Sequence, residues 1–440
     1  MMAKKEQVPV IRFQGFADPW EQRKLGDIAD IVGGGTPSTG NQSYWDGDID
    51  WYAPAEIADQ IYANSSQKKI TGLGYENSSA KMLPPGTVLF TSRAGIGKTA
   101  ILTRKGCTNQ GFQSIVPYRG ELDSYFIFSR TEELKRYGEL VGAGSTFVEV
   151  SGKQMAVMEL MMPPTMREQQ TIGGFFQQLD HLITLHQRKF EKLTNVKKSM
   201  LEKMFPQNGS SYPEIRFKGF TDPWEQRKVG DLLIERNQQA PMSDEYPLMA
   251  FIASEGVAPK GERYDRSALV TDTVNKLYKK TEKGDFIYSS NNLETGSIGL
   301  NKYGKACISP VYSIFEPTGI ADSDFLGRRL VRKDFINAMV KWRQGVIYGQ
   351  WRIHESDFLK IEITVPSVEE QRKIGAYLDQ LDNLITLHQR KGKAAVTGCS
   401  NDTNNSKGVY FKARDFGYKC YKKVKSQQIR CLIAVFIFFV

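Results

Sequence analysis

The sequence predicts an α+β fold: two tandem copies of a mixed α/β domain, each followed by a long coiled-coil-forming helix, with the second helix truncated. Three observations support this prediction. Two sequence blocks each occur twice, strand-like apolar segments lie between the blocks, and a helical apolar repeat follows each domain. The 440 residues also suit two or three domains of about 150 residues each.

The first repeated block spans residues 9–27 and recurs at residues 213–231, an offset of 204 residues. Both copies contain the run Asp-Pro-Trp-Glu-Gln-Arg-Lys. The second block spans residues 168–189 and recurs at residues 370–391, an offset of 202 residues. Solenoid repeats are only about 20–50 residues long, so this period indicates a duplicated domain.

Between the repeated blocks, the two copies share only short strand-like segments. Residues 86–92 correspond to residues 284–290, and residues 157–164 correspond to residues 361–366. These segments alternate or run apolar, as buried strands do. We therefore predict domains at residues 9–165 and 213–367, in which a common frame encloses two different interiors.

A heptad pattern follows the first domain. From Ile172 to Met204, mostly apolar residues recur at alternating spacings of four and three, which is typical of a coiled-coil seam. Pro206 ends the pattern, so we expect a helix over residues 166–206 that is about 60 Å long. The second helix, over residues 368–391, begins in the same way. The predicted helix interface comprises Ile172, Phe176, Leu179, Ile183, His186, Phe190, Leu193, Ile374, Leu378, Leu381, Ile385 and His388.

The seam admits two interpretations. Each helix could lie along its own domain as an ordinary amphipathic helix. The repetition of the seam 202 residues apart instead favours the packing of one helix on the other. His186 and His388 are then polar residues that set the register or form hydrogen bonds, and we do not expect them to bind a metal.

The net charge of +10 is poor evidence for nucleic-acid binding, because most of it lies near the end of the chain. Residues 392–440 contain nine Lys and Arg and two Asp, which account for +7 and leave +3 for residues 1–391. The two domains are therefore nearly neutral, and their function must be argued from other features.

Catalytic motifs are incomplete. Residues 95–99 read Gly-Ile-Gly-Lys-Thr, but a phosphate-binding loop needs glycine where Ser92 stands. Glycines 33–35 precede Pro37 and polar residues, so we expect a flexible loop there and no phosphate-binding helix start. The Asp-Pro-Trp runs are interpreted as turns. We therefore expect no catalytic residues and no metal site.

The sequence favours a cytoplasmic protein that does not enter the membrane. Five cysteines show no metal-ligand spacing and no even number for a disulfide framework, which suits a reducing compartment. The basic start is not followed by the apolar stretch of a signal peptide. Residues 431–440 are apolar but far shorter than the about 20 residues of a membrane-spanning helix.

The two-copy layout, the frames at residues 13–27 and 163–172, and the helix end at residues 203–206 together resemble the specificity subunit of Type I restriction-modification systems. The resemblance covers residues 9–391. It implies two target recognition domains, each reading one half of a split DNA sequence, and two helices that pack antiparallel as a spacer. On this basis we expect sequence-specific DNA binding by a chain that is not an enzyme.

The same resemblance implies the partners. The expected partners are double-stranded DNA, two methylation subunits that dock on the helices, and restriction subunits that complete an ATP-dependent nuclease. We expect no cofactor in this chain, because S-adenosylmethionine and ATP would be bound by the partner subunits. The predicted helix is longer than one DNA turn of about 34–36 Å, which suits a spacer between two half-sites.

Exposed loops with hydrogen-bonding side chains are the candidates for reading bases, although such loops can also be merely solvated or contact phosphates. The candidates in the first domain are Thr36, Ser38, Thr39, Tyr44, Trp45, Arg93, Lys98, Asn109, Gln110 and Thr146. The candidates in the second domain are Ser290, Asn291, Asn292, Arg343, Tyr348, Gln350, Trp351 and Arg352. A structural role is expected for Phe13, Phe16, Trp20, Phe217, Phe220 and Trp224.

The second helix departs from the first after Lys391. Gly392 and a run of polar turn-forming residues replace the heptad pattern, so we expect truncation at residue 391 and an unrelated, disordered tail over residues 392–440. This departure supports an alternative function: a truncated, inactive or regulatory specificity protein that serves as a scaffold or a reservoir of recognition modules.

Overall fold

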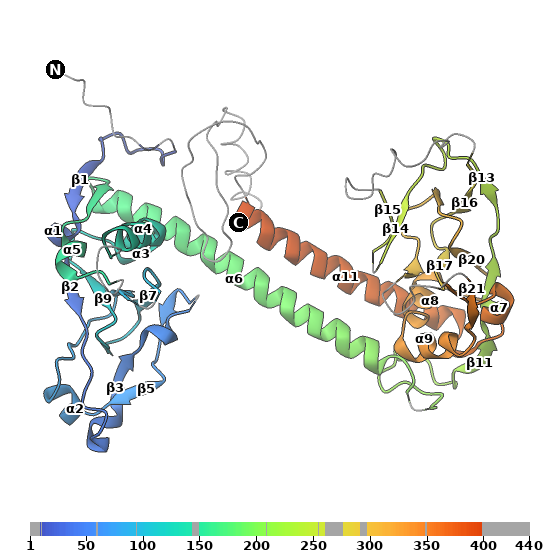
Figure 1. Cartoon of the computed structure of the whole chain (residues 1–440), viewed down its shortest axis with the longest axis horizontal. Coiled ribbons are helices and arrows are strands. Elements are labelled where there is room, and N and C mark those ends of the chain that lie inside the picture. The colour runs from blue at the N-terminus through green and yellow to red at the C-terminus, as the bar shows by residue number, and fades with distance from the viewer. Residues whose placement is uncertain are drawn as a thin grey trace. The chain divides into compact units, whose positions relative to one another are not determined.

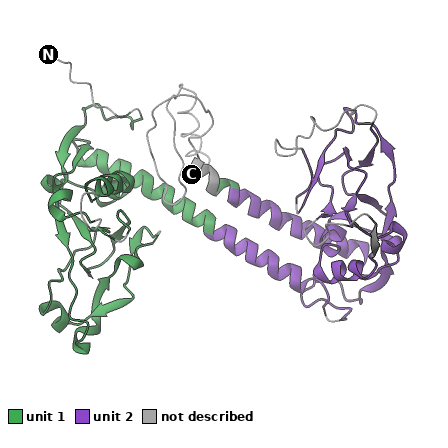
Figure 2. Cartoon of the chain, in the orientation of Figure 1, with its two compact units in different colours: residues 1–187, 390–440 green, residues 188–389 purple. Residues whose placement is uncertain are grey.

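The computed structural model describes residues 9, 11–58, 60–93, 95–142, 149–207, 209–253, 255–259, 276–290, 297–347 and 350–397. The chain divides into two compact units, residues 1–187 with 390–440 and residues 188–389 (Figure 2). Figure 1 labels helices α6 (Met166–Lys203) and α11 (Val368–Thr397), and each of them contributes residues to both units (Figure 2).

Unit 1 contains the first domain and the first part of α6. Its strands are β1 (Glu21–Lys24), β2 (Ala29–Gly33), β3 (Trp45–Tyr52), β4 (Tyr62–Ala63), β5 (Lys68–Ile70), β6 (Val88–Phe90), β7 (Thr99–Leu102), β8 (Cys107–Thr108), β9 (Gln113–Pro117) and β10 (Glu159–Met162). Its other helices are α1 (Leu25–Ile28), α2 (Gly72–Glu76), α3 (Ser124–Ser129), α4 (Thr131–Gly142) and α5 (Gly152–Ala156).

Strand β6 lies at the centre of the first domain. It is the middle strand of a five-stranded sheet in the order β2-β9-β6-β7-β4. Because successive side chains of a strand point to opposite faces, Val88 and Phe90 join the core that includes α3 and α4, while Leu89 joins a second core on the other face. A separate sheet, in the order β5-β3-β8, and a two-stranded β1-β10 sheet complete the domain.

Unit 2 contains the second domain, the last part of α6 and most of α11. Its strands are β11 (Glu225–Lys228), β12 (Leu233–Glu235), β13 (Gln239–Ala240), β14 (Ala250–Ile252), β15 (Gly256–Ala258), β16 (Tyr278–Thr281), β17 (Phe286–Tyr288), β18 (Ile298–Leu300), β19 (Ala306–Ile308), β20 (Ser313–Pro317), β21 (Gln344–Ile347), β22 (Gln350–Arg352) and β23 (Glu362–Val365). Its other helices are α7 (Val229–Leu232), α8 (Ser323–Arg329), α9 (Lys333–Val340) and α10 (Glu355–Phe358).

The second domain repeats the plan of the first. Strand β17 lies within a sheet in the order β12-β20-β17-β18. Phe286 and Tyr288 enter one core and Ile287 enters another, as their counterparts on β6 do. The β11-β23 pair matches the β1-β10 pair. The strands predicted within residues 86–92, 284–290, 157–164 and 361–366 are therefore confirmed as β6, β17, β10 and β23.

The first long helix agrees with its prediction, whereas the second does not end where expected. Helix α6 ends at Lys203, shortly before Pro206. Helix α11 continues through Gly392 to Thr397, so the expected end at residue 391 is wrong, although α11 with 30 residues is shorter than α6 with 38. One internal glycine costs only about 1 kcal/mol relative to alanine, and the following Ala394 and Ala395 are the strongest helix formers. The tail was expected over residues 392–440. Residues 392–397 belong to α11, and residues 398–440 lie outside the described residues.

Candidate nucleic-acid interface and its helical support

In each unit, the repeated segment before the first strand is fastened to the start of a long helix. The Arg12 guanidinium donates two hydrogen bonds to Glu168 on α6, at 2.8 and 2.7 Å, and Trp20 Nε1 donates a third at 3.2 Å. In unit 2, Arg216 donates to Glu370 on α11 at the same two distances, 2.8 and 2.7 Å. Both carboxylates are only 1% exposed. The repeated blocks thus share one structural task, which is to hold each domain on its helix.

The glutamine after each of these glutamates forms a second attachment. Gln169 accepts a hydrogen bond from the Asp123 backbone N–H, and Gln371 accepts one from the Asp322 backbone N–H, both at 3.0 Å. Asp123 and Asp322 in turn cap α3 and α8 with their side chains. The Glu-Gln pair of the second repeated block is therefore explained by its contacts with the domain. The repeat is visible in the sequence, whereas these contacts are visible only in the structure.

The six aromatic residues expected to be structural have that role. Phe13 packs edge-on against Phe175 of α6 with ring centroids 5.6 Å apart, and Phe217 packs against Tyr377 of α11 at 5.8 Å. Arg167 lies over the Phe16 ring and Lys373 over the Phe220 ring. Trp20 packs edge-on against Phe126, and Trp224 packs against Phe205 and Phe325.

Within unit 2, the last part of α6 packs against the first part of α11. Leu193, Val196 and Met200 of α6 border the core cluster that contains Leu378 and Leu381 of α11. All twelve residues of the predicted helix interface are buried or half-buried. Ile172 and Phe176 are half-buried against the core of their own domain, as the alternative interpretation expects. Helix-on-helix packing is present in unit 2, where Leu193 of α6 borders the core that contains Leu378 and Leu381 of α11.

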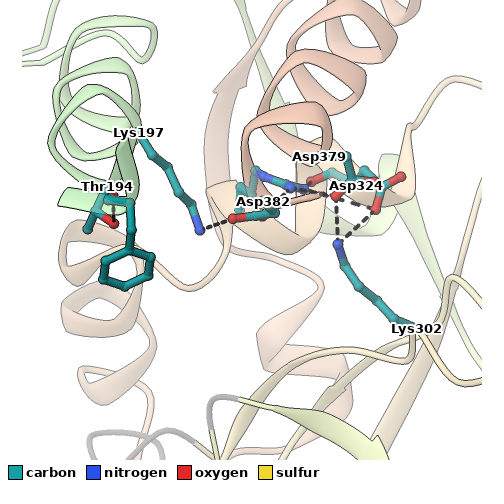
Figure 3. A network of polar contacts seen from close by, with 8 residues as sticks. Thr194, Lys197, Lys302, Asp324, Asp379 and Asp382 are labelled. Carbon is teal, nitrogen blue, oxygen red and sulfur yellow. Dashed lines mark hydrogen bonds and ion pairs between the residues drawn. The ribbon is translucent and has the colours of Figure 1, made fainter. Parts of the chain in front are cut away.

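A network of ion pairs ties α11 to the second domain and to α6 (Figure 3). Arg328 of α8 lies 2.6 Å from Asp379 and 3.0 Å from Asp382. Lys302 lies 2.8 Å from Asp379, and Lys197 of α6 pairs with Asp382. Burial acts to raise the pKa of Asp379, but its hydrogen bonds to Lys302 and Arg328 outweigh burial and lower that pKa.

Unit 1 attaches its helix with neutral hydrogen-bond partners at the corresponding positions. Asp180, the copy of Asp382, accepts a hydrogen bond from the Tyr125 hydroxyl at 2.7 Å. Gln177, the copy of Asp379, donates to the Tyr62 hydroxyl at 2.5 Å. The two domains are thus held by the same helix positions through different chemistry.

Four of the candidate base-reading residues of the first domain come together from three loops. The Thr36 hydroxyl donates to Gln110 Oε1. The Asn109 carboxamide accepts a hydrogen bond from the Gly111 backbone N–H at 2.8 Å. The Gly111 carbonyl accepts one from the Ser92 backbone N–H, at 2.8 Å, next to Arg93. We call Thr36, Arg93, Asn109 and Gln110 the loop cluster.

The glycines before Thr36 permit this assembly. A Cβ on Gly34 would lie 2.0 Å from the Asn109 carbonyl oxygen, and one on Gly35 would lie 2.4 Å from the Ala80 nitrogen. The Gly35 N–H also donates to the Thr108 carbonyl at 2.8 Å. The expected flexible loop is therefore a closely packed segment, and its glycines are required by the close approach of other backbone.

Lys98 is exposed on the hairpin between β6 and β7. The residues after it form strand β7, so no helix directs its amide groups toward this loop. A phosphate-binding loop would need that helix, and the sequence-based rejection of such a loop is therefore supported.

The other four described candidates of the first domain lie beside the β5-β3-β8 sheet. The Trp45 indole donates to the Ser38 carbonyl at 3.1 Å and packs edge-on against Trp51 at 5.1 Å. Ser38 and Thr39 are exposed, whereas Tyr44 and Trp45 are half-buried. Trp45 therefore serves the packing of this sheet and still presents part of its ring to solvent.

Asp50 is a buried charge on β3, the middle strand of the same sheet. It is 3% exposed and accepts hydrogen bonds from the Ser66 N–H and hydroxyl, both at 3.0 Å. Arg104 lies 2.7 Å away and Lys69 lies 3.5 Å away. Burial raises the pKa of Asp50, but the Ser66 hydrogen bonds and the two cations outweigh it, and the pKa lies below its usual value.

In the second domain, the structure brings Ser290 and Arg343 together. The Ser290 hydroxyl accepts a hydrogen bond from the Ile353 N–H at 3.1 Å, and its carbonyl accepts one from Arg343 at 3.4 Å. Gln350, Trp351 and Arg352 form β22, although their side chains are not described. The candidates Thr146, Asn291, Asn292 and Tyr348 lie outside the described residues.

In the part of the chain that the structure describes, no group of three or more His, Cys, Asp or Glu side chains could hold a metal ion. None of the helices in the same part is long and apolar enough to cross a membrane.

Comparison with known proteins identifies a family for both halves of the chain. The family model described as Type I restriction modification DNA specificity domain matches residues 17–195 and again residues 221–397. The MjaIX specificity subunit of Methanocaldococcus jannaschii is 32% identical over 273 residues, which are 59% of this chain and 63% of the relative. The chain therefore spans less than two thirds of that relative's length.

Two further similarities are more distant. The EcoR124I/EcoR124II specificity subunit of Escherichia coli is 26% identical over 170 residues, 37% of this chain and 41% of the relative. A crystal structure of the S subunit of a Type-I restriction-modification system from M. genitalium superposes with a TM-score of 0.52 at 12% identity, covering 89% of this chain and 96% of that one. The latter likeness supports the fold described above.

Proposed function

Because the chain belongs to the family of Type I restriction modification DNA specificity proteins, we propose that each of its two domains reads one half of a split DNA sequence. A specificity subunit is the recognition component of its complex and is not an enzyme, in agreement with the incomplete catalytic motifs of this sequence.

The observation that carries this proposal is the contrast between the frames and the loops of the two domains. The Arg12–Glu168 and Arg216–Glu370 pairs have the same two distances, 2.8 and 2.7 Å. The loops that these frames support differ in sequence, because the loop cluster of the first domain has no identical copy in the second. Two surfaces that are held by the same kind of ion pair but carry different side chains suit the reading of two different half-sites.

The long helices would set the distance between the half-sites. Helix α6 has 38 residues and is therefore about 57 Å long, more than one DNA turn of about 34–36 Å. Near its start Arg12 pairs with the buried Glu168, and near its end Met200 and Leu201 pack against the core of the second domain. A stiff element with anchored ends is what a fixed half-site spacing requires.

The proposed partners are double-stranded DNA, two methylation subunits and restriction subunits. The exposed Leu185, Leu384 and Leu387 on α6 and α11 offer apolar contact surface to such subunits. S-adenosylmethionine and ATP would be bound by the partners, and this role would place the chain in the cytoplasm.

Mapping of adenine methylation tests the proposal. The full chain is co-expressed with its cognate methylation subunit in a host without adenine methylation, and methylated sites are mapped across the host genome. We expect one split motif with a constant spacing. Failure of the two proteins to co-purify, or methylation without any sequence motif, would contradict the proposal.

The alternative of an inactive scaffold was based on a helix that stopped at residue 391. Helix α11 extends to Thr397, but with 30 residues it is still shorter than α6, which has 38. The alternative would be favoured by a complex that assembles but methylates no site.

A further inference from the structure

We propose that the hairpin tip formed by residues 91–93 and 95–98 is the part of the first domain that probes the DNA groove, and that Thr91 is the positioning residue that holds it. This inference rests on the proposed function. Arg93 and Lys98 are the side chains that would touch DNA, whereas Thr91 would act only through them.

Thr91 joins both sides of the tip through its side chain and its backbone. Its hydroxyl donates to the Gly95 carbonyl at 2.7 Å and accepts from the Lys98 N–H at 2.9 Å. Its backbone N–H donates to the Lys98 carbonyl, and its carbonyl accepts from the Gly97 N–H, both at 3.0 Å. Thr91 is fully buried. One buried residue therefore makes four hydrogen bonds to the segment that carries Lys98.

The conformation that Thr91 holds requires glycine at two positions of the tip. Gly95 and Gly97 have φ values of +103° and +94°, in the left-handed region that favours glycine. A Cβ on Gly97 would also lie 2.3 Å from Lys135 Cγ. These constraints give the tip a defined shape. A pre-formed shape reduces the ordering cost when a side chain enters a groove.

The cations of the tip are available to a ligand. Lys98 is exposed, and Arg93 is half-buried. Arg93 lies 4.0 Å from Glu149, and both side chains of this pair are more than a third exposed, at 37% and 38%. An ion pair of this length and exposure is weak, so Arg93 can leave Glu149 for a base edge or a phosphate.

The backbone also places the tip beside the loop cluster. Thr91 forms an isolated bridge with Phe112, and the Ser92 N–H donates to the Gly111 carbonyl at 2.8 Å. Asn109 and Gln110 immediately precede Gly111. The tip therefore adds Lys98 to the amides and hydroxyls already gathered around Arg93, and this combination suits base reading next to a phosphate contact.

The second domain has a hydroxyl residue at the corresponding place. Ser289 is 4% exposed, and its N–H donates to the Ser297 carbonyl at 2.8 Å, as the Thr91 N–H donates to the Lys98 carbonyl. The interiors of the two domains have otherwise diverged. The retained position indicates that the base of this hairpin has the same task in both domains.

The test uses the complex with the methylation subunit and the split motif that the wild-type chain gives. Thr91→Val removes the hydroxyl at nearly constant shape, and we expect about a tenfold loss of discrimination at the half-motif read by the first domain. The other half-motif should stay unchanged. Thr91→Ser restores the hydroxyl and should restore discrimination.

Thr87→Val is the matched control. Thr87 is also fully buried next to β6, and its hydroxyl donates to the Pro84 carbonyl at 2.7 Å, at the opposite end of the strand from the tip. We expect this variant to keep both half-motifs. Equal loss of discrimination in the Thr87→Val and Thr91→Val variants would reduce Thr91 to a general structural role and overturn the inference.

Lys98→Ala keeps the inference testable even if Thr91→Val does not fold, because Lys98 is exposed. Loss of one phosphate contact should make the dependence of log affinity on log salt shallower by about 0.9. An unchanged salt dependence together with an unchanged motif would overturn the inference. A wild-type complex that gives no motif would instead contradict the proposed function.

Discussion

Arg216 and Glu370 form a bidentate ion pair across 154 residues of sequence, and the Glu370 carboxylate is 1% exposed. The hydrogen bond to Glu370 raises the pKa of Arg216. The pair fastens the segment before the second domain to the start of α11, in the same way as Arg12 and Glu168 fasten the first domain to α6.

Loss of the Arg216 charge should therefore destabilise unit 2. The Arg216→Met variant would leave Glu370 buried without its counter-charge, at a cost of about 3–5 kcal/mol. Urea unfolding of the full chain measures this cost. Arg227→Met is the control, because its pair with Glu225 is exposed and should contribute less than about 1 kcal/mol. Similar effects of the two variants would show that the buried pair has no special importance.

The helix seam predicts a second difference in stability. Leu378 of α11 is fully buried in the core that α6 borders, so Leu378→Ala should cost about 2–5 kcal/mol. Leu387 is on the same helix but 43% exposed. The Leu387→Ala variant should unfold at nearly the wild-type urea concentration. An equal loss of stability in the two variants would contradict the packing of α6 on α11.

The buried Asp50 should make the stability of the first domain sensitive to acid. Its pKa is lowered in the folded state, so its stabilisation is complete above the unfolded value near 3.8 and is lost as the pH falls through the folded value. Asp50→Asn should cost about 2 kcal/mol at pH 6, from lost charge-assisted hydrogen bonds. The difference in the free energy of unfolding between this variant and the wild type should become smaller below pH 4. A difference that is constant from pH 6 to pH 2 would argue against an ionised Asp50.

The position of Gly392 within α11, which ends at Thr397, leads to a fourth prediction. Because Gly392 lies inside the helix, Gly392→Ala should stabilise that turn by about 0.5–1 kcal/mol. Slower amide hydrogen exchange over residues 393–397 would report this change. Gly392→Pro should instead accelerate exchange there, because proline removes a helical hydrogen bond. Fast exchange in the wild type and no response to either variant would place the helix end at residue 391 after all.

Local sequence patterns were sufficient to predict the duplication, the principal strands and the long helices. Burial of a strand on both faces requires an apolar run, as in β6, and a packed helix requires an apolar stripe, as in α6. Both the apolar run and the apolar stripe can be recognised from a few neighbouring residues of the sequence. The end of α11 differs from the prediction because a single internal glycine costs only about 1 kcal/mol in a helix and two alanines, Ala394 and Ala395, follow it.

The contacts between distant residues could not be predicted in this way. The partner of Arg12 lies 156 residues away, and Thr36 meets Gln110 across 74 residues, so no periodic pattern connects them. The repeat offered one usable signal, since an arginine and a glutamate recur together in both blocks. Which loops gather around Arg93 depends on strand order in the sheet, and the close approach at Gly34 depends on packing. The sequence therefore specified the duplicated frame through local patterns, whereas long-range strand pairing assembled the surface proposed to read DNA.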